Sequence, residues 1–258
     1  MDPLILKSVK KTYRLDKVDV PALVDIDLRI HPHCFTVLSG ASGSGKTTLL
    51  NLIGCIDRPD EGEVTVAGQA VASLSDNALA DFRLRHIGFI FQNFNLLPVL
   101  TAYENIEYPL LLTRTPAAAR RKRVRELLEA VGLSKHERHW PGQLSGGQRQ
   151  RVAIARALAT APELVLADEP TANLDSQTGA AIIALMRAMQ RDYRATFVFS
   201  SHDPKVLAEA DDAVLLQDGR VIAHERRRAA GGVQCVRLPS LCVTCPAIAA
   251  APSPRCWP

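Results

Sequence analysis

The sequence lacks any apolar run that approaches the roughly 20 residues needed to cross a bilayer as a helix. Behind Met1 it also lacks a basic segment followed by an apolar one, so we expect no secretory signal. Acidic residues and lysine are missing after Glu225, although five arginines occur there. These absences favour a cytosolic protein whose residues 226–258 differ in composition from the rest.

The net charge of +4 comes from this C-terminal segment. Without its five arginines, 26 basic residues stand against 27 acidic ones. The remainder of the chain therefore has no basic surplus of the kind that nucleic-acid-binding domains carry, and we expect no nucleic-acid partner. A chain of 258 residues suffices for one large domain or two small ones.

Cysteine is rare in residues 1–225, which contain only Cys34 and Cys55. The C-terminal segment holds one C-x-x-C pattern, Cys242 to Cys245, without a second pair or a nearby histidine. Zinc binding or redox use is the weaker interpretation of so short a pattern. We interpret residues 226–258 as an atypical tail and expect it to be poorly ordered.

A glycine-rich segment follows a short apolar strand predicted at residues 35–38 and precedes an apolar helix. It has the form G-x-x-x-x-G-K-[ST], which is typical of a loop that binds phosphate through backbone N–H groups and a helix N-terminus. In this interpretation Lys46 reaches the β- and γ-phosphates, and the Thr47 hydroxyl is a ligand of Mg²⁺. The predicted nucleotide-binding residues of this loop are Gly40, Ala41, Ser42, Gly43, Ser44, Gly45, Lys46, Thr47 and Thr48.

Apolar strands alternate with helical segments through the rest of the chain, which predicts an α/β fold with a mainly parallel sheet. Strict alternation over residues 25–30 predicts a half-buried strand, and the strands near the N-terminus predict an antiparallel sheet. Asp218-Gly219 between two apolar runs predicts a hairpin. Residues 93–112 are apolar, and with prolines at 98 and 109 we expect them to be irregular.

Two carboxylates, Asp168 and Glu169, follow a predicted strand of four apolar residues. Ligands of open α/β sheets bind at the carboxyl ends of the strands. Asp168 therefore suits a Mg²⁺ shell, and Glu169 suits the polarisation of a water molecule that attacks the γ-phosphorus.

A second anion site is predicted where Ser145 caps a helix that begins with two glycines. The chain has two predicted phosphate-binding sites, but only the glycine-rich loop carries a lysine. This favours a second site that serves the nucleotide of another protomer.

Taken together, these motifs resemble those of the nucleotide-binding subunits of ABC transporters. Residues 144–148, Leu-Ser-Gly-Gly-Gln, match the family signature, and residues 149–158 match the helix that follows it. Gln92 matches the Q-loop glutamine, residues 173–175 match the D-loop, and His202 matches the switch histidine. Residues 87–98 and 167–175 resemble the lipoprotein-releasing and macrolide-export subgroup.

The resemblance implies a P-loop NTPase with a RecA-like core, an N-terminal antiparallel β-subdomain and a helical subdomain over about residues 93–157. The nucleotide-binding domain would comprise residues 1–225. Two departures stand out, because His33-Cys34 replaces a usual Gly-Glu and Ala172 replaces a frequent glycine.

The resemblance also implies cofactors and residue roles. ATP and Mg²⁺ would be bound, with Tyr13 stacked on the adenine. Catalysis would involve Glu169, His202 and Gln92, and the Mg²⁺ ligands would be Thr47, Gln92 and Asp168. The residues expected at the nucleotide from the signature and the D-loop are Ser145, Gly146, Gly147, Gln148 and Asp175.

We therefore expect an ATPase subunit that forms a homodimer and drives a separate membrane permease from the cytoplasmic face of the inner membrane. The apolar segment 94–98, with Leu97, is expected either to receive a permease helix or to pack within the helical subdomain. The alternatives are a soluble ABC ATPase of DNA repair or translation and a regulator that only binds nucleotide. The single cassette without a long heptad insert disfavours the first alternative, and the presence of Glu169 and His202 disfavours the second.

Overall fold

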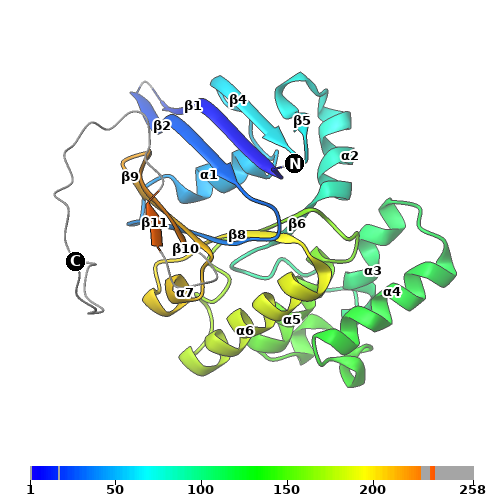
Figure 1. Cartoon of the computed structure of the whole chain (residues 1–258). Helices are drawn as coiled ribbons and strands as arrows, with labels where there is room; N and C mark the ends of the chain where they lie inside the picture. Colours follow the sequence, from blue (N-terminus) through cyan, green and yellow to red (C-terminus); the bar gives the residue numbers. More distant parts are fainter. Residues whose placement is uncertain (1, 17, 228–232, 236–258) are drawn as a thin grey trace.

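Two β-sheets enclose a single helix in the computed structural model, which describes residues 2–16, 18–227 and 233–235. The smaller sheet lies at the top of Figure 1, and the larger one crosses the middle of the molecule. Helices α5 (Gly146–Ala157) and α6 (Ser176–Tyr193) cover the opposite face of the larger sheet. The layers are therefore sheet, helix, sheet and helices.

The smaller sheet is antiparallel and has the strand order β2-β1-β4-β5. Its strands are β1 (Leu4–Leu15), β2 (Val18–Ile30), β4 (Glu61–Val66) and β5 (Gln69–Ala70). In β2 the side chains of Ile26, Leu28 and Ile30 are buried, and the residues between them are more exposed. This alternation confirms the half-buried strand predicted at residues 25–30.

The larger sheet has the strand order β11-β10-β9-β3-β8-β7-β6. The strands from β9 to β6 are parallel, and β10 and β11 are antiparallel additions at one edge. The bounds are β3 (Phe35–Ser39), β6 (Ile87–Ile90), β7 (Leu164–Ala167), β8 (Thr196–Ser200), β9 (Asp212–Gln217), β10 (Arg220–Arg227) and β11 (Val233–Cys235). The predicted hairpin joins β9 to β10, with positive φ at both Asp218 (48°) and Gly219 (73°), as a type I′ turn requires.

Helix α1 (Lys46–Ile53) lies between the two sheets. Its Leu49, Leu52 and Ile53 side chains are fully buried against residues of both sheets. Burial of this kind stabilises the fold by about 1.5–3 kcal/mol per large aliphatic side chain. Because α1 begins directly after the glycine-rich loop, its packing fixes the position of that loop on the larger sheet.

The remaining helices lie on the side of the β6 edge or below the larger sheet (Figure 1). Their bounds are α2 (Asp76–His86), α3 (Ala102–Leu112), α4 (Ala117–Ala130) and α7 (Pro204–Ala208), with the short 3-10 helices η1 (Val71–Ser73), η2 (Ser134–His136) and η3 (Pro141–Gln143). Helices α3, α4 and α5 fall within the range expected for the helical subdomain. The expected division into domains stays a prediction.

Helix α3 corrects the expectation that residues 93–112 are irregular. Thr101 and Glu104 form a capping box, in which each side chain accepts a hydrogen bond from the other residue's backbone N–H. Pro109 sits inside the helix, where it removes one backbone hydrogen bond. Buried Ile106 and Leu110 pack into the main core and offset that loss.

His33 occupies the turn where the family resemblance led us to expect glycine. Its φ of 57° is left-handed, which explains the usual preference for glycine at this position. The Thr196 hydroxyl accepts from the His33 N–H at 3.0 Å, and the Gln190 side chain donates to the His33 carbonyl at 2.6 Å. These contacts hold the turn with a larger residue in place.

The chain does not leave the sheet at the boundary expected after Glu225. Strand β10 continues to Arg227, and β11 pairs with it antiparallel, with Glu225 opposite Cys235. The buried carboxylate of Asp212 lies 3.8 Å from the Arg226 guanidinium. The expectation of a poorly ordered tail otherwise concerns residues 228–232 and 236–258, which lie outside the described residues.

Candidate active site

The candidate site is built where neighbouring parallel strands end. Strands β3, β8, β7 and β6 are adjacent, and all of them present their carboxyl ends at the same edge. The glycine-rich loop follows β3, His202 follows β8, Asp168 and Glu169 follow β7, and Gln92 follows β6. The strand order therefore gathers residues from four separate motifs at one edge of the sheet.

The glycine-rich loop approaches other backbone segments too closely for side chains. A Cβ atom at Gly40 would lie 2.2 Å from the Leu216 carbonyl oxygen, and one at Gly45 would lie 2.7 Å from the Ala22 carbonyl oxygen. Both glycines also have positive φ, 145° and 101°. The loop is thus a cradle lined by backbone groups that only glycine can form at these two positions.

Lys46 begins helix α1 and folds back over the loop. Its Nζ donates hydrogen bonds of 2.8 Å to the carbonyl oxygens of Gly40 and Ala41, and the residue is 8% exposed. No side chain of the described residues caps the N-terminus of α1. The N–H groups of its first turn and the ammonium group thus form a positive end that suits phosphate oxygens.

Thr47 and Asp168 face each other across the site. The Thr47 hydroxyl lies 3.4 and 3.3 Å from the two carboxylate oxygens of Asp168. The Ser200 hydroxyl, at the end of β8, donates to Asp168 Oδ1 at 2.7 Å. The pair offers hydroxyl and carboxylate oxygens to one point, which is the donor set that Mg²⁺ prefers.

Glu169 is held by its backbone as well as by its neighbours. Its N–H donates to the Ser200 hydroxyl at 2.9 Å, and its φ of 41° is left-handed. Backbone conformations of this kind cost free energy and cluster at functional sites. The side chain is 29% exposed, with Oε1 3.4 Å from Nδ1 of His202, whose side chain is 74% exposed.

Gln92 follows β6 in a loop that contacts the segment after β7. The Asn173 amide donates to the Gln92 carbonyl oxygen at 3.1 Å and to the Asn93 side chain at 3.0 Å. This contact ties the loop expected to carry the Q-loop glutamine to the loop expected to be the D-loop. The sequence pattern did not indicate that Asn173 links these two loops.

The signature residues lie at the N-terminus of α5. Ser145 and Gln148 form a capping box, which confirms the predicted helix cap. A Cβ at Gly147 would lie 2.6 Å from the Thr178 methyl group in α6. Asp175 caps α6 by accepting from the Gln177 and Thr178 N–H groups. Of these features, only the close approach of Gly147 to Thr178 links α5 to α6. The hydrogen bonds of Lys46 and Asp168 given above involve none of these residues.

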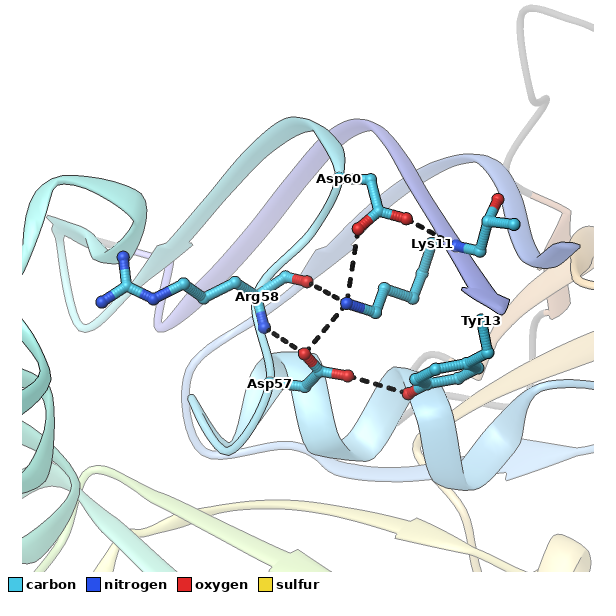
Figure 2. A network of polar contacts seen from close by, with 6 residues as sticks. Lys11, Tyr13, Asp57, Arg58 and Asp60 are labelled. Atoms are coloured by element: carbon cyan, nitrogen blue, oxygen red, sulfur yellow. Dashed lines mark hydrogen bonds and ion pairs between the residues drawn. The ribbon is translucent and has the colours of Figure 1, made fainter. Parts of the chain in front are cut away.

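Tyr13 lies on β1, above the N-terminal half of α1 (Figure 2). Its hydroxyl donates to Asp57 Oδ2 at 2.9 Å. Burial raises the pKa of Tyr13 above its usual value, and the hydrogen bond to Asp57 acts in the same direction. Tyr13 is therefore a neutral phenol, part-buried and held at its tip.

Sequence comparison decides the family. The profile of the family described as ABC transporter matches residues 23–172. The chain belongs to the ABC transporter family. The match spans the glycine-rich loop, Gln92, the signature residues and both carboxylates after β7.

Relatives of similar length support the same assignment. An uncharacterized ABC transporter ATP-binding protein of Thermotoga maritima is 46% identical over 222 residues, which cover 86% of this chain and 94% of that protein. YvrO, an uncharacterized ABC transporter ATP-binding protein of Bacillus subtilis, is 44% identical over 223 residues, or 86% of this chain and 97% of that protein.

A longer relative has the same cassette in a larger chain. The macrolide export ATP-binding/permease protein MacB of Rhodopirellula baltica is 47% identical over 227 residues. These cover 87% of this chain but 33% of that protein, so the present chain spans about a third of its length. The likeness confirms the resemblance to the macrolide-export subgroup.

A solved structure shares the architecture. A dimeric post-hydrolysis state of an ATP-binding cassette, bound to ADP and Pi, aligns with a TM-score of 0.80 and 43% identity over 88% of this chain and 99% of the other. This likeness confirms the predicted P-loop NTPase fold. The chain is therefore an ABC ATPase, which binds ATP and hydrolyses it. Across residues 2–16, 18–227 and 233–235, none of the helices has the length and apolarity to span a membrane.

Proposed function

We propose that this ABC ATPase powers a permease on a separate polypeptide, for the release of lipoproteins or the export of a hydrophobic compound. The observation that carries the ATPase mechanism is the convergence of Lys46, Asp168, Glu169 and His202 at the shared strand ends. The Thermotoga and Bacillus relatives support a separate permease, because the chain covers 94% and 97% of their lengths. In this proposal the protein acts at the cytoplasmic face of the membrane.

The phosphate end of ATP is assigned to the loop that follows β3. The glycine cradle places backbone N–H groups around the phosphates, and the Lys46 ammonium neutralises the β- and γ-phosphate oxygens. Thr47 and Asp168 fit Mg²⁺, because their three oxygens already meet within 3.4 Å. When bound, Mg²⁺ neutralises charge on the phosphate oxygens. The ligand role of Gln92 rests on the family resemblance.

The hydrolytic step is assigned to Glu169. Its carboxylate accepts a proton from the attacking water. The hydrogen bond from its backbone N–H to the Ser200 hydroxyl fixes the position of the Glu169 backbone, from which the side chain extends. His202 lies beside it, and in this proposal it donates a hydrogen bond to the γ-phosphate. Ser200 itself contacts Asp168 as well, so one hydroxyl orients both carboxylate residues.

The second half of each site is assigned to a partner protomer. The capped N-terminus of α5, with Ser145 and the two glycines after it, presents backbone N–H groups to an anion. Asp175 would contribute from the partner as well. The solved relative is dimeric, which supports a homodimer with two ATP molecules between the protomers.

The docking site for a short helix of the permease is assigned to a groove of about 610 Å³, which lies between the β6 edge and the neighbouring helices. Phe89, Phe91, Tyr108 and Leu112 line it, and the last two are 42% and 52% exposed. An apolar groove of this shape suits a short amphipathic helix. Leu97, expected at the docking surface, is 39% exposed but is not among the groove residues, so the proposed surface moves to α3.

Helix α3 offers a matched pair of variants for this docking surface. Leu112 lines the groove, whereas Leu111 does not, and the two side chains are 52% and 46% exposed. Leu112→Asp should keep basal ATP hydrolysis but lose co-purification with the permease and transport by the complex, because a charge enters an apolar contact. Leu111→Asp should keep both. Normal assembly of Leu112→Asp would reject the groove.

The nucleotide assignment is tested with Lys46→Ala. ATP affinity should fall about 10- to 100-fold, since hydrogen bonds to charged groups contribute about 1.5–3 kcal/mol. Lys122→Ala is the control, because the Lys122 side chain on α4 is 80% exposed. Equilibrium binding of ATP measures the effect, and near-normal affinity in Lys46→Ala would contradict the assignment.

A further inference from the structure

The Tyr13 side chain is tied to a residue far away in the sequence. Its hydroxyl donates to Oδ2 of Asp57, which lies in the loop after α1 (Figure 2). Tyr13 is on β1, so the contact joins the smaller sheet to the exit of the helix whose entrance holds the phosphates. The aromatic ring is thereby held above α1, the helix that begins directly after the phosphate loop.

Asp57 is itself held by other groups on its second oxygen. Lys11 Nζ donates to Oδ1 at 2.9 Å, and the Arg58 N–H donates to the same oxygen at 2.7 Å. Oδ1 of the carboxylate therefore accepts hydrogen bonds from Lys11 and the Arg58 N–H, and Oδ2 accepts the one from Tyr13. The Asp57 side chain is 30% exposed and that of Lys11 12% exposed.

Lys11 anchors the same loop through two further contacts (Figure 2). Its Nζ donates to the Arg58 carbonyl at 2.8 Å and lies 3.4 Å from Asp60 Oδ1. Asp60 accepts from the Thr12 N–H at 2.6 Å through its other oxygen. Three consecutive residues of β1, Lys11 to Tyr13, and the loop after α1 thus form one network around Asp57.

The charge states in the network agree with this geometry. Burial acts to raise the pKa of Asp57, but hydrogen bonds from Lys11, the Arg58 N–H and Tyr13 outweigh it, and the pKa is lowered. Asp57 is therefore an ionised acceptor, and the neutral Tyr13 phenol is its donor. Charge-assisted hydrogen bonds are shorter and stronger than neutral ones.

One face of the Tyr13 ring is in contact with a cation. Lys11 Nζ lies over the ring, 5.4 Å from its centroid. A base that stacks on Tyr13 would use the opposite face, because the Lys11 ammonium group lies over the first one. The network thus fixes both the tilt of the ring, through its hydroxyl, and the face that it presents.

We propose that Asp57 is a positioning residue for the nucleobase, which holds Tyr13 in the orientation that stacks on the base of ATP. This inference rests on the proposed function, in which Tyr13 stacks on the adenine. An unanchored ring has to be ordered when the base binds, and that ordering reduces affinity. The phosphate contacts of Lys46 and the hydrolytic residues do not involve Asp57, so the chemical step is unaffected.

The test compares ATP with a triphosphate that has no base. KM and kcat for ATP, and the inhibition constant of inorganic tripolyphosphate, are measured for Asp57→Asn, Tyr13→Phe and Tyr13→Ala. Asp57→Asn and Tyr13→Phe should each raise KM about 3- to 10-fold, as expected for the loss of one hydrogen bond of about 0.5–1.5 kcal/mol. Neither should change kcat or tripolyphosphate inhibition, and their double variant should resemble either one alone.

The other outcomes separate this inference from the stacking that it rests on. If Tyr13→Ala leaves KM unchanged, Tyr13 does not contact the base, and the proposed stacking fails together with the inference. If Tyr13→Ala raises KM but Tyr13→Phe and Asp57→Asn do not, stacking stands and the positioning role is overturned. A parallel loss of tripolyphosphate inhibition in Asp57→Asn would place its effect on the phosphate loop, which also overturns the inference.

One control variant, and the Tyr13→Phe variant of the test itself, protect the result against misfolding. Asp19→Asn, at an exposed position on β2, is the control for an aspartate change on the smaller sheet and should leave KM unchanged. If Asp57→Asn is unstable, Tyr13→Phe gives the result, because it removes the hydrogen bond to Asp57, together with the smaller interaction of the Tyr13 hydroxyl with Thr48, and leaves the contacts of Asp57 with Lys11 and Arg58 in place.

Discussion

The two ends of the nucleotide site are built by different means. At the phosphate end, the loops that follow four neighbouring strands lie at one edge of the sheet. The site there is formed by backbone groups and by buried residues such as Lys46 and Ser200. At the base end, Tyr13 is held by side-chain contacts between β1 and the loop after α1, with Asp57 30% exposed. Strand order fixes the first region, and a polar network fixes the second.

This difference predicts a division of labour between the two regions. Groups that act on the attacking water or hold the carboxylates after β7, such as Glu169 and Ser200, act in the transition state and therefore change kcat, whereas Lys46 binds the phosphates of ATP and changes affinity. Groups that hold the base bind substrate and transition state equally and therefore change KM. The predictions below test this division from the largest expected effect to the smallest.

The largest effect is expected for Glu169→Gln. The amide keeps the size of the side chain but cannot take a proton, so kcat should fall about 10²- to 10⁴-fold, the usual contribution of a general base. ATP should still bind, and the ATP-bound dimer should accumulate in size-exclusion chromatography. Glu129→Gln, at an exposed position on α4, is the control. Hydrolysis at the wild-type rate by Glu169→Gln would show that the base lies elsewhere.

A smaller effect at the same end is expected for Ser200→Ala. The change leaves the Glu169 N–H without its acceptor and Asp168 without its 2.7 Å donor. We expect kcat to fall about tenfold, with KM for ATP nearly unchanged, because about 1.4 kcal/mol of lost transition-state stabilisation, the size of one such hydrogen bond, corresponds to a factor of ten in rate.

The control for Ser200 is a second buried hydroxyl in the same sheet. Thr36 on β3 is fully buried, and its hydroxyl has no hydrogen-bond partner among the described residues. Thr36→Val should therefore leave kcat unchanged. Equal losses in Ser200→Ala and Thr36→Val would attribute the effect to packing of the sheet rather than to the two carboxylates.

The smallest effect is expected on stability at the base end. Because the folded protein lowers the pKa of Asp57 below 3.8, its stabilising contribution is present above that pH and is lost as the pH falls through the lowered value. Wild type should exceed Asp57→Asn in Tm by about 2 °C near neutral pH, as a change below 1 kcal/mol produces in a domain of this size. The difference should disappear in acid.

Thermal unfolding at a series of pH values measures this difference. Asp19→Asn serves again as the control and should match wild type at every pH. A Tm difference for Asp57→Asn that stays constant as the pH passes below 3.8 would show that the charge of Asp57 does not stabilise the network.

The phosphate end could be predicted from the sequence because its motifs are local. The glycine-rich loop, the carboxylates after β7 and the Ser145 cap each occupy a few consecutive residues beside a periodic apolar segment. Helix α3 was predicted wrongly as irregular, because Pro109 was weighted above the Thr101 and Glu104 capping pattern that starts the helix. The pattern was present in the sequence and could have identified it.

The supporting residues could not be predicted in the same way. Ser200 contacts Asp168 across 32 positions of sequence, and Asp57 contacts Tyr13 across 44. No periodicity or spacing relates residues so far apart; the strand order brings Ser200 to Asp168, and the packing of β1 on α1 brings Tyr13 to Asp57. Strand β11 was also missed, because it consists of three residues in a segment without a sustained apolar pattern.

The most direct test of the central claim measures binding and chemistry separately on one variant from each end. Equilibrium ATP affinity and the single-turnover hydrolysis rate at saturating ATP are determined for Tyr13→Ala and Glu169→Gln. The account predicts opposite outcomes, with weaker binding and a normal rate for Tyr13→Ala, and normal binding and a lost rate for Glu169→Gln. A saturated Tyr13→Ala enzyme that hydrolyses slowly, or a Glu169→Gln enzyme that no longer binds ATP, would contradict it.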